Sequence, residues 1–238
     1  MTRAVDEVVS VSDLLLAVRR QQAKHRPAEV QAVPDVTTEV VSVSGAHPGV
    51  GATTVALALA EAISDGEREV TLVDEALNAD AFAAAECEVD SGDSDWKAGR
   101  RGSVRILRGS SSSEPPGGDR VIVDGSRPDE THHVLVCRAT LPSLRRAEPS
   151  MTSGTAVAVV AAARWPRRLR ASLGPAMSEA ISDGRVVFFP YSRDLDQYGV
   201  DADPLPAPTL AVARRLAELL MPGYVGTTSP NRRKGLRR

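Results

Sequence analysis

The chain has 238 residues, of which 42% are hydrophobic but only 3% aromatic, and its formal net charge is −2. This length suits one α/β domain with short extensions, since such domains contain about 150 to 250 residues. The scarcity of aromatic residues implies a core of Val, Leu and Ala, as in a parallel sheet covered by helices. No apolar stretch reaches the roughly 18 residues of a membrane span, and the first residues lack the apolar region of a signal peptide. We therefore expect a cytoplasmic protein, and the charge argues against nucleic-acid binding along the whole chain.

The N-terminal region, residues 1–38, is predicted to be an appendage. Residues 10–26 carry apolar side chains at helical spacing and begin with a sequence similar to a capping box. Pro27 and Pro34 then interrupt a polar stretch. The apolar stripe of this helix needs a partner, which is either the main domain or another protein.

From Glu39 onward, apolar runs of strand length alternate with helical stretches, which is the pattern of a doubly wound α/β fold. Residues 53–63 are apolar on nearly every side and predict a buried helix, and residues 212–220 predict the inner face of a closing helix. We therefore predict a three-layer, mostly parallel sheet in a domain of residues 39–221. The predicted strands are 40–43, 70–73, 104–107, 121–123, 134–136, 155–160 and 186–189.

Two segments break this alternation. Residues 90–103 and 110–119 are rich in Ser, Gly, Asp and Pro, and we expect them to be loops or disordered. The two cysteines, Cys87 and Cys137, lie far apart and have no Cys or His partner at zinc spacing. This arrangement predicts ordinary buried thiols, with neither a disulfide nor a metal site.

A glycine-containing turn, SGAHPGVGATT, directly follows the first predicted strand and precedes the buried helix. A strand, a glycine turn and a helix in this order are the context of a phosphate loop. Small residues let backbone N–H groups converge on phosphate oxygens at a helix N-terminus, whose partial positive charge favours an anion. Alternatively, the glycines only form a tight turn between strand and helix. The predicted nucleotide-binding residues are Pro48, Gly49, Val50, Gly51, Ala52, Thr53 and Thr54, with the Thr53 hydroxyl placed to ligate Mg²⁺.

This loop resembles that of the ParA/MinD family of P-loop ATPases, which have a SIMIBI-like fold. Residues 48–54 are similar to the GGVGATT-like loop of its CpaE/TadZ branch, which is tied to pilus assembly. The strand that ends at Asp74 resembles the family's second strand, and the sequence RVIVD, ending at Asp124, resembles its Walker B strand. The resemblance covers about residues 39–221. It implies that ATP is the ligand, that Asp124 holds Mg²⁺ through water, and that the chain forms a homodimer around nucleotide.

The departures from the family pattern concern the groups that power hydrolysis. Ala52 stands at the position of the P-loop lysine, and His47 at that of the signature lysine that reaches across the dimer. Glu75 and Ala76 follow Asp74, so the second acid of the family's Asp-x-Asp, which resembles a water-positioning residue, is missing. One cationic group can contribute about 10³ to 10⁵ in the rate of phosphoryl transfer. We therefore predict weak or moderate nucleotide binding with little or no hydrolysis.

The basic tail, residues 222–238, contains five basic residues and no acidic one. Its basic cluster includes a single apolar residue, Leu236, so the tail cannot form an amphipathic membrane helix. Weak contact with DNA or anionic lipid, and a purely solubilising role, are the two alternatives.

Three hypotheses of function follow from the sequence. The first is a degenerate nucleotide-binding protein that positions or assembles a pilus, secretion or partition machine. The second is a working ATPase that drives partitioning or polar localisation, with Arg127 or another arginine in place of a lysine. The third is a DNA-associated factor of a mobile element that acts through the basic tail.

Overall fold

The computed structural model describes residues 39–64, 69–76, 80–89, 96–109, 119–125, 132–160, 162 and 164–221. The predicted N-terminal helix at 10–26, the basic tail and Arg127 lie outside the described residues. The strands are β1 (Glu39–Gly45), β2 (Val70–Asp74), β3 (Cys87–Val89), β4 (Trp96–Arg101), β5 (Val104–Gly109), β6 (Arg120–Asp124), β7 (His132–Arg138), β8 (Ala156–Val160) and β9 (Val186–Phe189). The helices are α2 (Ala52–Ile63), α3 (Asp80–Ala83), α4 (Leu141–Ala147), the 3₁₀ helix η1 (Glu148–Ser150), α5 (Arg167–Arg170), α6 (Pro175–Ser182), α7 (Arg193–Tyr198) and α8 (Ala207–Leu220).

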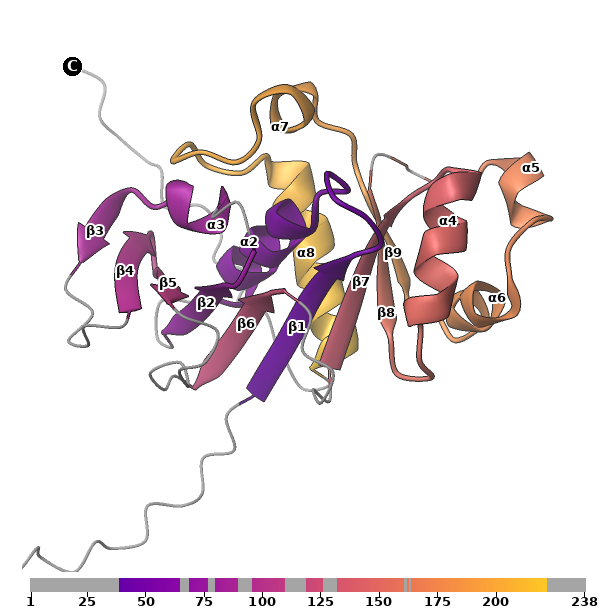
Figure 1. Cartoon of the computed structure of the whole chain (residues 1–238), viewed down its shortest axis with the longest axis horizontal. Coiled ribbons are helices and arrows are strands. Elements are labelled where there is room, and N and C mark those ends of the chain that lie inside the picture. Colours follow the sequence, from indigo (N-terminus) through magenta and orange to yellow (C-terminus); the bar gives the residue numbers. More distant parts are fainter. Residues whose placement is uncertain are drawn as a thin grey trace, which may run out of the picture. The chain divides into compact units, whose positions relative to one another are not determined.

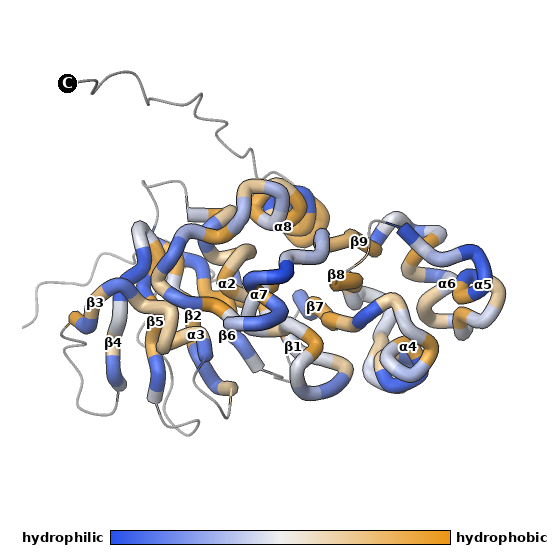
Figure 2. Tube along the Cα trace, turned by 90° about the horizontal axis from the view of Figure 1, so that it is seen from above, coloured by the Kyte–Doolittle hydropathy of each residue, from blue (hydrophilic) through white to orange (hydrophobic). Residues whose placement is uncertain are grey.

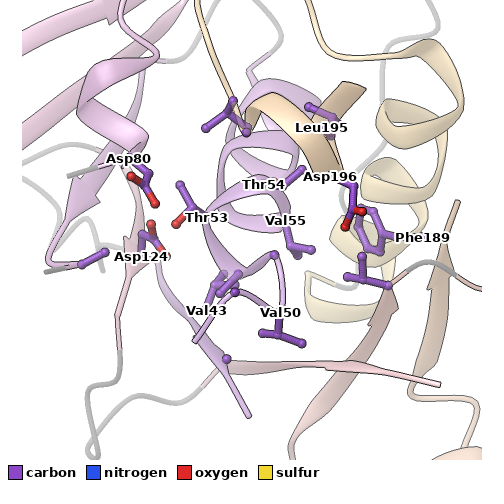
Figure 3. Close-up of a pocket in the computed structure, with 18 of the residues that line it drawn as sticks. Val43, Val50, Thr53, Thr54, Val55, Asp80, Asp124, Phe189, Leu195 and Asp196 are labelled. Atoms are coloured by element: carbon purple, nitrogen blue, oxygen red, sulfur yellow. The ribbon is translucent and has the colours of Figure 1, made fainter. Parts of the chain in front are cut away.

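The described strands form one nine-stranded sheet in the order β3-β4-β5-β2-β6-β1-β7-β8-β9 (Figure 1). All pairings from β5 to β9 are parallel, and the antiparallel pairings of the described sheet are β3 with β4 and β4 with β5. Val43 of β1 pairs with Asp124 of β6, so the carboxyl ends of these central strands meet at one edge. The start of α2 lies at this edge, with Thr53 close to Asp124 (Figure 3). The predicted mostly parallel α/β fold and all seven predicted strands are confirmed.

Helices cover both faces of the sheet because successive residues of a strand point to opposite sides. On β7, Val134 and Val136 join the large core cluster beneath α2 and α8, whereas Leu135 and Cys137 join a second cluster with α4 and α6. Figure 2 shows α8 and α4 on opposite sides of the strands. Helix α2 is buried along most of its length, as predicted. Among the described helices, none is long and apolar enough to cross a bilayer.

The prediction of a loop or disorder at 90–103 is wrong for Trp96–Arg101, which forms β4. Its exposed residues are charged, and the run WKAGRR has no β-branched residue and one aromatic residue, so it lacks the pattern that identifies a strand in sequence. Trp96 and Ala98 nevertheless point inward and are buried. Trp96 packs over Gly109 of β5, where an added Cβ would lie 2.5 Å from the indole ring.

The two cysteines differ in their environment. Cys137 is buried in the second core cluster, as predicted, and burial raises the pKa of its thiol to about 12. Cys87 is exposed, so the prediction of a buried thiol is wrong there. The physical reason is that β3 is an edge strand whose three residues are all exposed.

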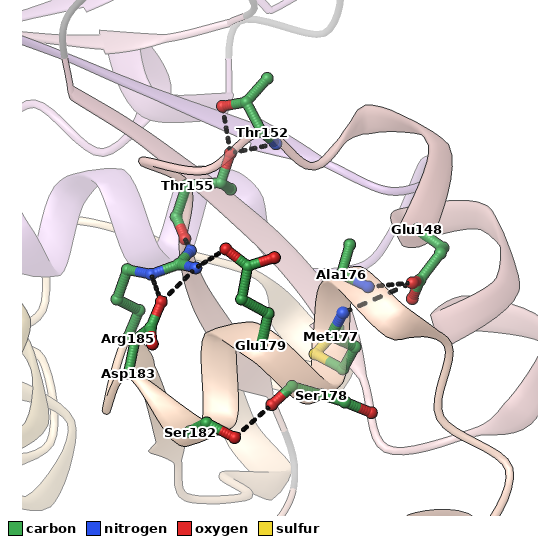
Figure 4. A network of polar contacts seen from close by, with 10 residues as sticks. All are labelled: Glu148, Thr152, Thr155, Ala176, Met177, Ser178, Glu179, Ser182, Asp183 and Arg185. Carbon is green, nitrogen blue, oxygen red and sulfur yellow. Dashed lines mark hydrogen bonds and ion pairs between the residues drawn. The ribbon is translucent and has the colours of Figure 1, made fainter.

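Polar contacts fasten helix α6 to the second face of the sheet (Figure 4). The Glu148 carboxylate accepts a hydrogen bond from the N–H of Ala176 at 2.7 Å, at the start of α6. Arg185, after α6, donates to the carbonyl of Thr155 at 2.6 Å and pairs with Asp183 at 2.9 Å. These bonds hold α6 beside strands β8 and β9.

Arg101 is a buried arginine that joins three parts of the domain. Its side chain is 3% exposed and pairs with Glu61 of α2. It also donates to the carbonyls of Ala84, Asp201 and Asp203. A buried guanidinium with this many acceptors connects β4 to α2 and to the segment before α8.

We expect Arg101→Ala to lower the free energy of unfolding by about 3 kcal/mol, because it leaves a carboxylate and three carbonyls without their buried donor. Chemical unfolding followed by circular dichroism measures the change. The matched control is Arg100→Ala on the same strand, since Arg100 pairs with Glu69 where both side chains are about half exposed. That variant should lose less than about 1 kcal/mol, and equal losses in the two variants would contradict the assignment.

Candidate functional site

The loop between β1 and α2 has the geometry of a phosphate cradle. Gly49 and Gly51 have φ angles of 72° and 97°, a region that favours glycine, and Gly51 is the N-cap of α2. No side chain forms a capping hydrogen bond there, and the first turn of α2 contains no acidic residue. The positive end of a buried helix therefore opens onto the loop without a side chain occupying it.

A pocket of about 1040 Å³ lies over this loop. Thr53, Asp80 and Asp124 line one part of it and Phe189, Leu195 and Asp196 another (Figure 3). Every residue predicted to bind nucleotide lines the pocket, as do His47 and Asp124. Arg138, Pro190, Tyr191 and Tyr198 also line the pocket.

Asp124 and Thr53 are the pair that could hold a divalent cation. Asp124 is 2% exposed, accepts a hydrogen bond from the Thr53 side chain, and has a second oxygen, Oδ2, that is buried without a partner. Within the described residues, no three His, Cys, Asp or Glu side chains cluster closely enough to hold a metal alone. Mg²⁺ usually takes one or two carboxylates together with phosphate oxygens and waters, so this hydroxyl and the free carboxylate oxygen fit it.

Burial raises the pKa of Asp124 to about 6; the hydrogen bond from Thr53 opposes the rise, and the neighbouring charges of Asp74 and Asp80 add to it. Asp74 and Asp124 are paired in register on β2 and β6, which explains their repulsion. A nearby cation would stabilise the ionised form of Asp124.

The carboxylate of Asp74 forms hydrogen bonds with nearby backbone groups. Its two carboxylate oxygens accept hydrogen bonds from the N–H groups of Ala76 at 3.1 Å and Phe82 at 2.8 Å, and Arg108 lies 3.8 Å away. Burial raises the pKa of Asp74, which these contacts partly offset. Asp74 does not line the pocket, so its carboxylate holds α3 against the end of β2.

Both ring nitrogens of His47 form hydrogen bonds within its own chain. Its Nδ1 lies 2.9 Å from the carbonyl oxygen of Pro48, and its Nε2 lies 2.9 Å from the hydroxyl oxygen of Ser143 on α4. The same hydroxyl accepts the backbone N–H of Arg138. In this arrangement the imidazole links the loop to α4 and does not extend away from the domain, as a residue reaching across a dimer would.

Two charged pocket residues were missed at the sequence level: Asp80 and Asp196. Asp80 is the first residue of α3 and lies near Thr53 and Asp124 (Figure 3). Its signal in sequence was an acidic residue before a short apolar run, which is typical of a helix start but says nothing about the pocket. Asp196 carries no local signal of this kind, whereas Arg138 begins the basic segment 138–146, whose arginines the sequence offers as candidates to face phosphate, a partner or solvent.

The sheet, the cradle and the adjoining carboxylate at the end of β6 together define the fold class of P-loop nucleotide-binding domains. No model of a known protein family matches the chain, and neither does any curated protein sequence.

Solved structures with this fold are MinD and ParA-type ATPases. The chain is similar to MinD of Aquifex aeolicus in a MinC:MinD cell division complex, with a TM-score of 0.52, 17% identity, and coverage of 75% of this chain and 95% of that one. It is similar to a ParA family ATPase from Chlorobium tepidum TLS, with a TM-score of 0.53, 16% identity, and coverage of 76% and 98%. A third is a Borrelia burgdorferi B31 protein assigned to plasmid partition and bound to AMPPNP, with a TM-score of 0.54, 10% identity, and coverage of 76% and 97%. The described domain therefore has the MinD/ParA P-loop fold.

We expect Asp124→Asn to raise the free energy of unfolding at pH 7.5 by about 2 kcal/mol. The folded-state pKa of about 6 lies above the ordinary 3.8, so ionisation of Asp124 costs the folded state more than the unfolded one. The free-energy cost of ionising Asp124 is complete above pH 6 and disappears below pH 3.8. The stabilisation by Asp124→Asn should therefore fall below about 1 kcal/mol by pH 4.5.

Urea unfolding at pH 7.5 and pH 4.5 tests this expectation. The control is Glu218→Gln on α8, an exposed residue away from the pocket, which should change stability by less than about 0.5 kcal/mol at either pH. A loss of stability in Asp124→Asn at pH 7.5 would show that the Asp124 carboxylate is not strained by burial.

Proposed function

We propose that the chain binds ATP with Mg²⁺ at the phosphate loop, hydrolyses it little or not at all, and acts as a positioning or assembly factor for another machine. The observation that carries this proposal is a phosphate loop with Ala52 at the position of the P-loop lysine. Residues 48–51 lie between β1 and α2, and Ala52 is the first residue of the helix. No lysine is present among the described residues that line the pocket.

The residues present account for binding better than for catalysis. The loop amides and the N-terminus of α2 bind a phosphate anion without a charged side chain. Thr53 and Asp124 would hold Mg²⁺, which supplies charge neutralisation when bound. Asp74 does not line the pocket, and its carboxylate accepts hydrogen bonds from Ala76 and Phe82, so it is not placed to orient a water molecule there.

The far part of the pocket has room for the nucleoside. Phe189 is the last residue of β9, and Pro190 follows it. Tyr191 precedes α7 and Tyr198 is its last residue, and their surfaces are 59% and 72% exposed. A pocket of about 1040 Å³ is at the upper end of the range for small-molecule sites. Its apolar and aromatic lining suits a base and ribose.

The proposed partner is a protein of a larger assembly. One neighbour of this fold is MinD in complex with MinC, and another is assigned to plasmid partition. The CpaE/TadZ-like loop favours a pilus or secretion apparatus among such machines. A homodimer would need contacts other than His47, whose ring nitrogens are already hydrogen bonded. The basic tail would add weak attraction to DNA or anionic lipid.

A second candidate function, a slow ATPase, is favoured by two pocket residues. Asp80 supplies a carboxylate and Arg138 a cation close to the loop. If these groups replace the missing acid and lysine, hydrolysis should be measurable, and Ala52→Lys should increase it further. If they do not, Ala52→Lys should tighten binding without turnover.

Isothermal titration of the full chain with Mg²⁺ and ATP, alongside a phosphate-release assay, tests the proposal. We expect saturable binding and turnover far below about one per second, the lower end for kinases. Thr53→Ala should weaken binding of Mg²⁺–ATP by about tenfold because it removes a metal ligand.

The control is Thr140→Ala, since Thr140 is exposed and makes no side-chain capping bond to α4. This variant should bind like the unaltered chain. Turnover near one per second would overturn the non-hydrolysing assignment, and the absence of any saturable binding would overturn nucleotide binding itself.

A further inference from the structure

Arg138 occupies a particular place beside the phosphate loop. It is the last residue of β7, the strand that pairs with β1, whose end leads into the loop. Because parallel strands end at the same edge of the sheet, this side chain begins next to the cradle. Among the described residues that line the pocket, it is the only arginine or lysine.

The contacts of Arg138 hold it near the loop while leaving donors free. Its Nη2 lies 2.9 Å from an oxygen of Asp196 on α7 and 3.4 Å from the carbonyl oxygen of Gly49. Its Nε is buried and has no hydrogen-bond partner. Its backbone N–H donates to Ser143, which in turn contacts His47 of the loop. The guanidinium is thus anchored beside Gly49 with hydrogen-bonding capacity to spare.

We propose that Arg138 is the cation that binds nucleotide phosphate at this loop in place of the missing lysine, and that Asp196 holds it until phosphate arrives. This inference rests on the proposed nucleotide binding. The Arg138–Asp196 pair is 38% and 40% exposed, and pairs of this kind contribute little to stability. A phosphate group offers more charge and a two-pronged acceptor that matches the guanidinium, so it competes effectively with one carboxylate oxygen.

The charges of the pocket support this role independently. Asp80, Asp124 and Asp196 line the pocket and would repel a polyphosphate. Asp124 has an unpartnered buried oxygen that points to a bound cation. With Mg²⁺ at Asp124 and Arg138 at the loop, positive charge would flank the phosphates from two sides. Without Arg138, the cradle would rely on backbone amides and the metal alone.

The experiment is isothermal titration of the full chain and its variants with Mg²⁺–ATP and, as a phosphate-free comparison, with adenosine. Arg138→Ala should weaken Mg²⁺–ATP binding by about tenfold to a hundredfold, as expected for loss of a hydrogen bond from a charged group, and should leave adenosine binding unchanged. Arg138→Lys should restore most of the affinity because it keeps the charge.

Asp196→Asn should have the opposite effect on the affinity for Mg²⁺–ATP. By freeing the guanidinium it should tighten Mg²⁺–ATP binding about twofold to fivefold, with the larger effect at low salt. A merely structural role of the ion pair predicts weaker binding or no change. The matched control is Arg146→Ala on α4, an exposed arginine outside the pocket, which should bind like the unaltered chain.

The outcomes separate this inference from the nucleotide proposal. If the unaltered chain binds Mg²⁺–ATP and Arg138→Ala binds it equally well, the role of Arg138 is refuted while nucleotide binding stands. If the unaltered chain binds no nucleotide, both fail together. If circular dichroism shows that Arg138→Ala does not fold, the other two variants test the role of Arg138. Near-normal affinity of Arg138→Lys for Mg²⁺–ATP and tighter binding by Asp196→Asn would support it, and weaker or unchanged binding by Asp196→Asn would refute it.

Discussion

The backbone turn at Gly49 and Gly51 is the constraint on which the site depends. Both residues have positive φ, which lets the chain leave β1 and enter α2 within a few residues while the helix start faces the pocket. Helix α2 packs against both the sheet and α8 and is buried along most of its length. Packing therefore fixes the position of its N-terminus, where backbone N–H groups would bind the proposed phosphate without a lysine.

The charged residues among the described pocket lining are three carboxylates, Asp80, Asp124 and Asp196, and one guanidinium, Arg138. Burial and neighbouring carboxylates raise the pKa of Asp124 to about 6, so the ionised site costs stability. Sites that give up stability in this way are often functional, because a bound cation would relieve the cost. Arg138 is the only compensating guanidinium among the described lining residues, and Asp196 neutralises it. A bound metal ion and Arg138 would together balance the negative charge of the phosphate and of the pocket carboxylates.

The structural neighbours place this arrangement in a fold shared by MinD and ParA-type proteins, with identities of 10% to 17%. At such identities the likeness concerns the fold alone, and the side chains of the site are this chain's own. Ala52 and His47 stand where the resemblance to the family would place lysines, and Arg138 lies beside the loop. The chemistry of the pocket therefore has to be argued from its own contacts.

The sequence by itself determined the central parallel strands, the buried α2 and the loop from Pro48 to Thr54, because hydrophobic periodicity and glycine turns are local signals. It missed β4, whose single large apolar residue, Trp96, finds its packing partner Gly109 only in the folded sheet. Only the tertiary structure decided that Asp80, Arg138 and Asp196 share a pocket with the loop. These residues come from elements far apart in the chain, and their proximity follows from strand order and helix packing, which a linear pattern does not encode.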